Sequence, residues 1–575
     1  MLGNKAVARG LYEAGVCFVS SYPGTPSTEV TEEAALYDEI YCEWAPNEKV
    51  AMEAAFGASL AGRRSFCGMK HVGLNVAADP LYTMSYTGVN AGLVIVVADD
   101  AGMHSSQNEQ DSRHHAIASK VPMLEPSDSA EALAFTKLAF ELSERFDTPV
   151  IIKMCTRVAH SQSVVETGER TVPVKEYEKN IAKYVMMPAN AIRRHPIVEA
   201  RTAALREYAE TAPLNRVEMG GTALGIITSS TSYQYVREVM GDDVSVLKLG
   251  MVNPLPEKLI RDFAAKVDRL VVVEELDPII EEHVRRLGIE VSGKDILPLE
   301  GEFSQNLVAK ALGKDVPAGL SLGETVPVRP PVMCAGCPHR GLFYTLNKNK
   351  CTVLGDIGCY TLGAVAPLAA MEMTLCMGAS ISAVHGFNKA LGADNDKKAV
   401  AVIGDSTFMH SGMTGLANIA YNQSVSTVII LDNSITGMTG HQQNPTTGYN
   451  IKGDPAGKID LEALCRAMGF ARIRVVDPYD LSACDKVLKE ELAAPEPSVI
   501  ISRRPCALLK YVKHKAPLAV DPDKCIGCKS CMRIGCPAIS IRDGKARVDA
   551  TLCVGCGICS QLCPKDAFHS TGKEA

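Results

Sequence analysis

Short runs of consecutive aliphatic and β-branched residues recur along the chain without polar alternation, and segments of helical period separate them. Strands that lack alternation are buried on both faces, which is typical of parallel sheets covered by helices. Helical periodicity is clear over 49–62 and 130–144. The pattern therefore predicts an α/β fold, with strands at 16–20, 93–98, 150–153, 224–228, 270–273, 399–403, 427–431 and 499–502.

The predicted elements fall into blocks of different character. Two long α/β blocks cover 1–165 and 325–512, and a shorter α/β block covers 220–318. The stretch 166–219 is charged and poor in strand signal, which indicates a helical insertion or linker. A small cysteine-rich block covers 517–575. At roughly 150 residues per domain, a chain of 575 residues is long enough for about four domains.

Composition and charge exclude several classes of protein. The 59 Lys and Arg residues against 66 Asp and Glu give a net charge of −7, which argues against a nucleic-acid-binding protein. No apolar run reaches the roughly 18–20 residues that span a bilayer, so we expect no membrane segment. Residues 1–15 lack the apolar core of a signal peptide, and we therefore expect a cytoplasmic protein. In a reducing compartment, 20 cysteines indicate metal or redox chemistry instead of disulfides.

Eight of the cysteines form two closely spaced groups near the carboxyl end, and each group closes with Cys-Pro. A C-x2-C-x2-C run lets three thiolates converge on one [4Fe–4S] cluster, while the fourth ligand comes from the other group. The spacing predicts two clusters, with ligands Cys525, Cys528, Cys531 and Cys563 for the first and Cys553, Cys556, Cys559 and Cys536 for the second. The extra residue before Cys536 predicts a bulged loop. A pair of zinc knuckles is the alternative, but zinc sites rarely combine three such cysteines with a closing Cys-Pro.

The remaining cysteines divide into two sets. One set lies in apolar or helical surroundings, which is typical of core thiols; it comprises Cys17, Cys42, Cys67, Cys155, Cys351, Cys376, Cys465 and Cys484. The other set lies in turns or at the ends of apolar runs: Cys334 and Cys337 in MCAGCPHR, Cys359 in GDIGCYTLG and Cys506 in ISRRPCALL. On spacing alone, this second set is compatible with a third cluster or with unrelated turn cysteines.

A different candidate site follows from AVAVIGDSTFMHSGMTGLANIAYNQSVSTVIILDNS, in which a helical span joins two strands. Such a β-α-β unit brings both strand ends to the same edge of a parallel sheet, where ligands bind. Asp405 and the Asn433 amide oxygen are thereby placed to ligate Mg²⁺, with a backbone carbonyl near Ile435. Because magnesium bridges phosphate oxygens, a diphosphate is the expected guest. The other candidate cofactor-binding residues are Gly404, Ser406 and Ser434.

This segment resembles the thiamine diphosphate motif, GDG followed about 25 residues later by Asn-Asn or a variant. Ser406 and Asp432 depart from that motif, so an ordinary α/β loop is the alternative. The cofactor also needs a carboxylate that hydrogen-bonds N1′ of its aminopyrimidine ring. Glu48 follows a strand-like segment and starts a helix, and we expect it to fill this role, whereas Glu43 and Glu53 are typical of solvated or helix-surface carboxylates. The two halves of the site would come from one chain or from two chains of a dimer.

On these motifs, the whole chain resembles the 2-oxoacid:ferredoxin oxidoreductases and, in domain order, their indolepyruvate branch. SYPGTPSTEV is similar to the family's Y-P-x-T-P-S element, which implies that Thr25 faces the substrate carboxylate. PNEKVAMEAAFGASLAG is similar to the glutamate element, which gives Glu48 its role. MCAGCPHR and GDIGCYTLG are similar to the entry of the diphosphate domain, which implies that His339 lies near the cofactor. TGMTGHQQNP is similar to the loop after the magnesium motif.

The resemblance implies a fold of two thiamine-diphosphate-binding parallel-sheet domains, a transketolase-C-like α/β domain and a 2[4Fe–4S] ferredoxin domain. In chain order, the first sheet domain covers 1–165, the transketolase-C-like domain 220–318, the diphosphate-binding domain 325–512 and the ferredoxin domain 517–575. Several family members also hold a cluster beside the thiamine. Its ligand elements match Cys334, Cys337, Cys359 and Cys506, although Arg-Arg-Pro before Cys506 departs from the common pattern.

The resemblance also implies a reaction and partners. The implied activity is oxidative decarboxylation of aryl pyruvates such as indolepyruvate, with the acyl group passed to coenzyme A and electrons passed through the clusters to external ferredoxin. The family's gamma domain has no obvious counterpart here and lies on a separate beta subunit in this branch. We therefore expect an obligate hetero-oligomer.

Three other functions are compatible with parts of the sequence. No motif distinguishes an enzyme for aryl pyruvates from one that carries out the same chemistry on pyruvate or a branched-chain 2-oxoacid. A non-oxidative thiamine decarboxylase with structural clusters is disfavoured by the intact eight-cysteine block. A catalytically silent electron-transfer or scaffold subunit is disfavoured by Glu48 together with Asp405 and Asn433.

Overall fold

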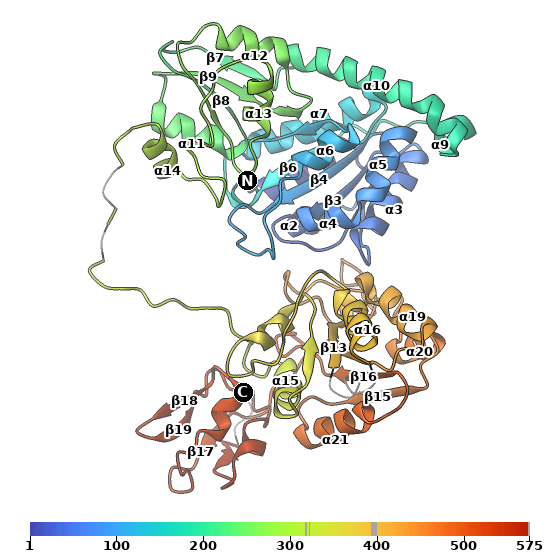
Figure 1. Cartoon of the computed structure of the whole chain (residues 1–575), viewed down its shortest axis with the longest axis vertical. Coiled ribbons are helices and arrows are strands. Elements are labelled where there is room, and N and C mark those ends of the chain that lie inside the picture. Colours follow the sequence, from blue (N-terminus) through green and yellow to red (C-terminus); the bar gives the residue numbers. More distant parts are fainter. Residues whose placement is uncertain (317–318, 321, 393–398, 573–575) are drawn as a thin grey trace. The chain divides into compact units, whose positions relative to one another are not determined.

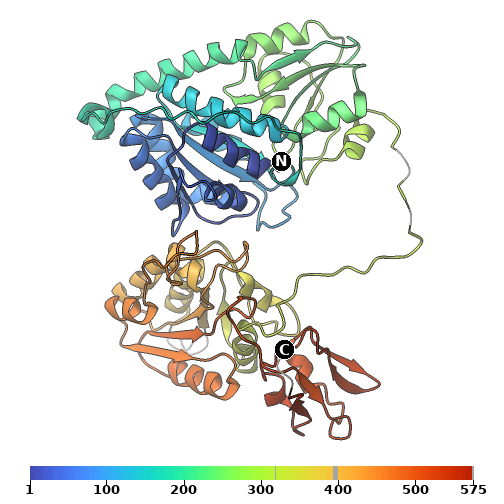
Figure 2. The ribbon, with the colours of Figure 1, turned by 180° about the vertical axis from the view of Figure 1, so that it is seen from behind.

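The computed structural model divides the chain into two compact units, Met1–Gly323 and Glu324–Ala575 (Figure 1; Figure 2 gives the view from behind). No helix among the described residues is long and apolar enough to cross a membrane. The structure describes residues 1–316, 319–320, 322–392 and 399–572.

The first unit contains a seven-stranded sheet that is parallel except at one edge. Every residue of its three central strands β3, β4 and β6 is buried. Because alternate residues of a strand point to opposite faces, continuous burial means that both faces are covered, as the unalternated pattern predicts. On one face, Leu93 and Ile95 share a core with Met52 of α3 (Glu48–Leu60). From edge to edge the strands are β10 (Met251–Asn253), β5 (Met123–Leu124), β6 (Val150–Cys155), β4 (Leu93–Asp99), β3 (Ser65–Lys70), β1 (Phe18–Ser21) and β2 (Tyr41–Trp44).

A second, four-stranded sheet completes the first unit. The connecting segment forms α9 (Ile181–Tyr184) and the long α10 (Pro188–Thr211), in agreement with a helical insertion. Its last residues, however, form a strand that pairs antiparallel with β9, so this sheet begins before the expected boundary at residue 220. In order across the sheet, the strands are β11 (Leu270–Val273), β8 (Gly225–Ser229), β9 (Ser245–Leu249) and β7 (Arg216–Glu218).

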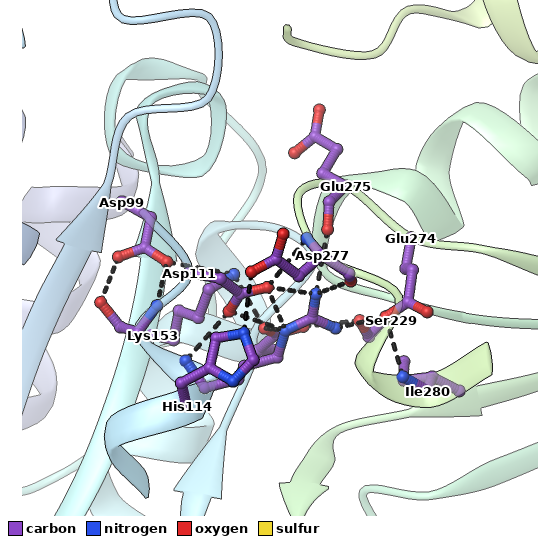
Figure 3. A network of polar contacts seen from close by, with 12 residues as sticks. Asp99, Asp111, His114, Lys153, Ser229, Glu274, Glu275, Asp277 and Ile280 are labelled. Carbon is purple, nitrogen blue, oxygen red and sulfur yellow. Dashed lines mark hydrogen bonds and ion pairs between the residues drawn. The ribbon is translucent and has the colours of Figure 1, made fainter. Parts of the chain in front are cut away.

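A buried network of charges joins the two sheets of the first unit (Figure 3). Arg113, which starts α6 (Arg113–Ser119), is 1% exposed and pairs with Asp111 at 2.6 Å. The same guanidinium pairs at 2.5 Å with Glu274, which follows β11 of the second sheet. Since an unpaired buried charge is costly, these pairs hold the two sheets in one arrangement.

The second unit contains a five-stranded parallel sheet. Alternate residues of its inner strand β13 enter two different cores: Val400 and Val402 pack with α15 (His339–Lys348), and Ala401 and Ile403 pack with α16 (Ala379–Leu391). The strands in order are β12 (Thr352–Leu354), β13 (Ala399–Gly404), β14 (Thr427–Asp432), β16 (Ser498–Arg503) and β15 (Arg472–Val476). Other helices of this domain are α19 (Met413–Tyr421), α20 (Leu461–Ala467) and α21 (Leu481–Leu492).

The cysteine-rich block forms a small module in the same unit. Two short antiparallel strand pairs frame it: β17 (Leu518–Val520) with β20 (Phe568–Ser570), and β18 (Ile539–Arg542) with β19 (Lys545–Val548). The short 3₁₀ helix η3 (Ser530–Ile534) includes the last cysteine of the first run, and η4 (Ser560–Leu562) follows the second run. The module packs through Ile534 and Ile558 against Leu481 of α21. The extra residue before Cys536 is accommodated by Gly535, whose φ of 65° ends η3.

Candidate functional site

The two strand ends of the predicted magnesium motif lie side by side, because β13 and β14 are parallel neighbours in the sheet. Asp405 directly follows β13 and is 2% exposed, and its carboxylate accepts a hydrogen bond from the Ser406 backbone N–H at 2.8 Å. Asn433 follows β14 and is also buried, and its amide oxygen accepts from the Ile435 N–H at 3.3 Å. Ser434, which lies between Asn433 and Ile435, adopts a φ of 59°, and the chain turns back sharply there.

The electrostatics of this edge fit a cation. Burial and the neighbouring Asp432 raise the pKa of Asp405 to about 7. Arg503 pairs with Asp432 at 2.8 Å. A carboxylate and an amide oxygen are hard ligands of the kind that Mg²⁺ prefers, and a divalent cation here would offset the repulsion between the two aspartates.

The loop after β14 supplies hydroxyl groups that sequence reasoning did not single out. Thr436 donates to the Ser406 hydroxyl at 2.9 Å, and Thr446 donates to Asn444 at 2.7 Å and lies 3.4 Å from the Asp405 carboxylate. Thr436 begins TGMTGHQQNP and Thr446 directly follows it, but nothing in this stretch of the sequence indicates which hydroxyl returns to the strand end.

His339 lies close to the same edge, at the start of α15. Its ring packs edge-on against Tyr360, with ring centroids 5.9 Å apart. Tyr360 in turn lies against Gly404, where a Cβ atom would stand 2.7 Å from the tyrosine ring. Burial lowers the pKa of His339 to about 4, so its imidazole is neutral at physiological pH.

The four loop cysteines gather beside this edge. The Cys506 backbone N–H donates to the Asn433 carbonyl at 2.9 Å, and a Cβ added to Gly437, four residues further along than Asn433, would lie 3.4 Å from the Cys359 sulfur. Burial raises the pKa of Cys359 to about 11, and the nearby Cys506 and Cys334 thiols add to this rise.

Cys337 belongs to the same group of sulfurs. Burial raises its pKa to about 12, and Cys334 and Cys359 contribute. His441, which the sequence did not indicate, lies with Nε2 3.8 Å from the Cys506 sulfur. Of the eight cysteines interpreted as core thiols, six are buried and Cys17 is half-buried. The interpretation is wrong for Cys376, which is exposed, because the segment before α16 runs over the surface.

The small cysteine-rich module, which we call the ferredoxin module after the resemblance of its sequence, brings its cysteines together in two separate cavities. The cysteines are grouped in the interleaved way that the spacing predicts. We call the two cavities the first cage and the second cage. The wall of the second cage also includes Ala335 and Gly336 of the Cys334–Cys337 loop. In the described part of the chain, no three His, Cys, Asp or Glu side chains converge on a site for one ion, and a four-iron cluster holds its thiolates further apart than one ion does. The first cage is lined by Cys525, Cys528, Cys531 and Cys563, and the second by Cys536, Cys553, Cys556 and Cys559.

In the first unit, Glu48 and Thr25 follow the adjacent parallel strands β2 and β1, and therefore lie at the same edge of that sheet. Glu48 is 5% exposed and starts α3, which Asn47 caps by accepting from the Val50 N–H at 2.9 Å. Its carboxylate packs on Gly73, where a Cβ would stand 2.6 Å from Oε1. Thr25 is half-buried.

The other two carboxylates considered for this role are placed differently. Glu43 is half-buried on β2 and accepts a hydrogen bond from the Ser20 hydroxyl at 2.9 Å. Glu53 is exposed and pairs with Lys49 on the surface of α3. A further buried group at the same sheet edge, His71 after β3, was missed because a single histidine in an apolar stretch carries no signal of its own.

Comparison with known proteins gives three domain families. Residues 9–215 match the family described as pyruvate flavodoxin/ferredoxin oxidoreductase, thiamine diphosphate-binding. Residues 356–502 match the C-terminal TPP-binding domain of thiamine pyrophosphate enzymes, and residues 546–569 match the 4Fe–4S binding domain. Together with the parallel sheets and the two cysteine cages, these matches define a thiamine diphosphate-dependent oxidoreductase that carries an iron–sulfur module.

Full-length relatives narrow the class. The chain is 40% identical to indolepyruvate oxidoreductase subunit IorA of Archaeoglobus fulgidus, over 99% of this chain and 97% of the relative. It is 41% identical to the protein of the same name from Pyrococcus horikoshii, over 99% and 96%, and 40% identical to that of Methanothermobacter marburgensis, over 100% and 97%. The chain therefore belongs to the indolepyruvate oxidoreductase subunit IorA family.

Proposed function

We propose that this chain is the thiamine- and cluster-bearing subunit of an indolepyruvate:ferredoxin oxidoreductase, which oxidatively decarboxylates aryl pyruvates such as indolepyruvate and forms the aryl-acetyl-CoA. The observation that carries the proposal lies within the second unit. There the Asp405–Asn433 edge contacts the loop cysteines, and the Cys334–Cys337 loop forms part of the second cage. The names of the full-length relatives support the choice of substrate.

In this proposal, Asp405, Asn433 and the Ile435 carbonyl would hold Mg²⁺, and Gly404, Ser406 and Ser434 would bind the diphosphate. When bound, thiamine diphosphate supplies the carbanion chemistry that releases CO₂ from a 2-oxoacid. The oxygen-only donor set and the raised pKa of Asp405 support the magnesium assignment.

Three side chains have proposed roles around the reacting groups. Glu48 would hydrogen-bond N1′ of the aminopyrimidine, a role supported by its burial at a helix start. Thr25 orients the substrate carboxylate with its hydroxyl. His339, held neutral by burial, offers one N–H and one acceptor nitrogen next to Tyr360.

The electron path follows from the cysteines. Each cage of the ferredoxin module binds one [4Fe–4S] cluster, and Cys334, Cys337, Cys359 and Cys506 bind a third. Clusters supply one-electron steps, which a two-electron oxidation requires in sequence. The third cluster is supported by the mutual effect of these thiols on one another's pKa and by the second-cage wall that their loop forms.

We propose that the chain works with a beta subunit that carries the gamma-type domain. External ferredoxin is the electron acceptor, and coenzyme A and the 2-oxoacid are the substrates.

The test is anaerobic co-expression of the chain with a beta subunit, followed by measurement of bound thiamine, iron, sulfide and substrate-dependent ferredoxin reduction. We expect bound thiamine and three clusters' worth of iron. C506S should lose one cluster's worth, while C376S, the exposed control, should lose none. Two clusters' worth of iron in the wild type removes the third site but keeps the enzyme. A folded, magnesium-supplied chain without thiamine contradicts the proposed function.

A further inference from the structure

A buried arginine lies between the loop cysteines and the ferredoxin module. Arg340, the second residue of α15, is 2% exposed. Its guanidinium donates to backbone carbonyls on both sides: to Cys334 at 3.0 Å and to Met333 in the loop, and to Ile534 at 3.1 Å and Gly535 at 2.5 Å in the module. One side chain therefore ties the two segments together.

The two acceptors in the module lie directly before Cys536, where the sequence has one residue more than the usual spacing. Gly535 occupies the position of this extra residue, and its φ is 65°. A Cβ at this position would stand 2.9 Å from Pro367 and 3.4 Å from Arg340 Nη1, so a side chain would collide with the proline and touch the guanidinium. The bulge predicted from the spacing is thus the part of the module that receives Arg340.

The guanidinium has no acidic partner in the part of the chain that the structure describes: all four of its polar contacts are neutral carbonyls. Burial lowers the pKa of the guanidinium, and cysteines of the loop and of the second cage oppose this shift, namely Cys536, Cys337, Cys334 and Cys556. A buried cation without a carboxylate is costly unless another anion compensates it.

Thiolate-bound iron–sulfur clusters are such anions. Their net charge is negative and becomes more negative by one unit on reduction, and net charge and hydrogen bonding set their potentials. A fixed positive charge next to a cluster therefore favours its reduced state. Arg340 stays protonated throughout, so the step moves one electron and no proton.

We propose that Arg340 is a positioning residue of the electron path, which fixes the Cys334–Cys337 loop on the module and raises the reduction potential of the cluster in the second cage. This inference rests on the proposed function, because it requires that the cages bind clusters.

The experiment is an EPR-monitored redox titration of the full chain with its beta subunit, using dithionite as reductant, after iron analysis. R340Q should shift one midpoint potential to a more negative value at unchanged iron content. R533Q is the matched control, since Arg533 lies in the same module but is exposed over the Tyr344 ring. It should leave all potentials in place.

R340K keeps the positive charge, and the potential of its second-cage cluster should stay close to that of the wild type. If R340Q does not retain iron, the potential measured for R340K tests the inference instead. Unchanged potentials in an iron-replete R340Q, or a potential lowered in R340K despite its charge, would overturn the inference. A wild-type chain that binds no clusters would instead contradict the proposed function, which keeps the two failures apart.

Discussion

Replacing Arg113 by Met should destabilise the first unit strongly. The substitution removes a guanidinium that is 1% exposed and pairs with Asp111 and Glu274 at 2.6 and 2.5 Å. It leaves both carboxylates buried without their cation. The methionine fills part of the volume, so the loss is mainly electrostatic.

The magnitude follows from these contacts. Two opposite charges about 4 Å apart attract by about 4 kcal/mol at an effective dielectric constant of about 20. Part of this is offset by the cost of desolvating the guanidinium. Removing one partner of a buried pair typically costs about 3–5 kcal/mol, and we expect R113M to lower the free energy of unfolding by that amount.

The assay is urea-induced unfolding, followed by a probe in the first unit. R157Q serves as control, because Arg157 is 57% exposed and its pair with Glu302 should contribute no more than about 1 kcal/mol. Adding D111N to R113M should restore part of the loss, since it removes one of the orphaned charges. If R113M is no less stable than R157Q, the network does not hold the two sheets together and the reasoning fails.

Three further predictions concern other regions. E48Q should lower substrate-dependent ferredoxin reduction by about 10²–10⁴-fold with the fold intact, whereas E53Q on the exposed face of α3 should retain activity; equal effects would remove Glu48 from its proposed role. Burial raises the pKa of Glu275 to about 7, so its contribution to stability is full below about pH 4.5 and is lost as the pH rises through 7. E275Q should therefore stabilise the chain at pH 8 and have little effect at pH 5, as measured by urea unfolding at both pH values. G336A should reduce the iron content of the second cage, because its Cβ would stand 2.2 Å from a valine side chain of the module, while G544A, with a similar φ of 72° but open space around it, should keep its iron.

The strands that the sequence predicts correctly are those with uninterrupted apolar runs. β4 (Leu93–Asp99) and β14 (Thr427–Asp432) are buried throughout, and each contains an unbroken apolar run, over 93–98 and 428–431. β3 (Ser65–Lys70) is equally buried but includes Ser, Gly and Lys, and β15 (Arg472–Val476) is a half-exposed edge strand with two arginines. Their positions are set by neighbours far along the chain, which a local pattern does not show.

The residues of the candidate site also fall into two groups, those that the sequence indicates and those that only the structure shows. The magnesium motif and the cages depend on residues at short spacing, and the fold places them where the spacing indicates. Arg340 and Thr446 reach their partners across loops, so their contacts appear only in three dimensions. The glutamate at the start of α3 was distinguishable from its neighbours in the sequence because it alone combines a helix start with a following small-residue stretch.

The shared wall of the second cage has a consequence for how this enzyme can be taken apart. Ala335 and Gly336, which lie in the loop before α15, line one side of that cavity, whereas the first cage is lined by the module alone. The ferredoxin module therefore does not supply the complete lining of both cages by itself. When the module is cut away from residues 335–336, the first cage keeps its whole lining, whereas the second cage loses part of its wall.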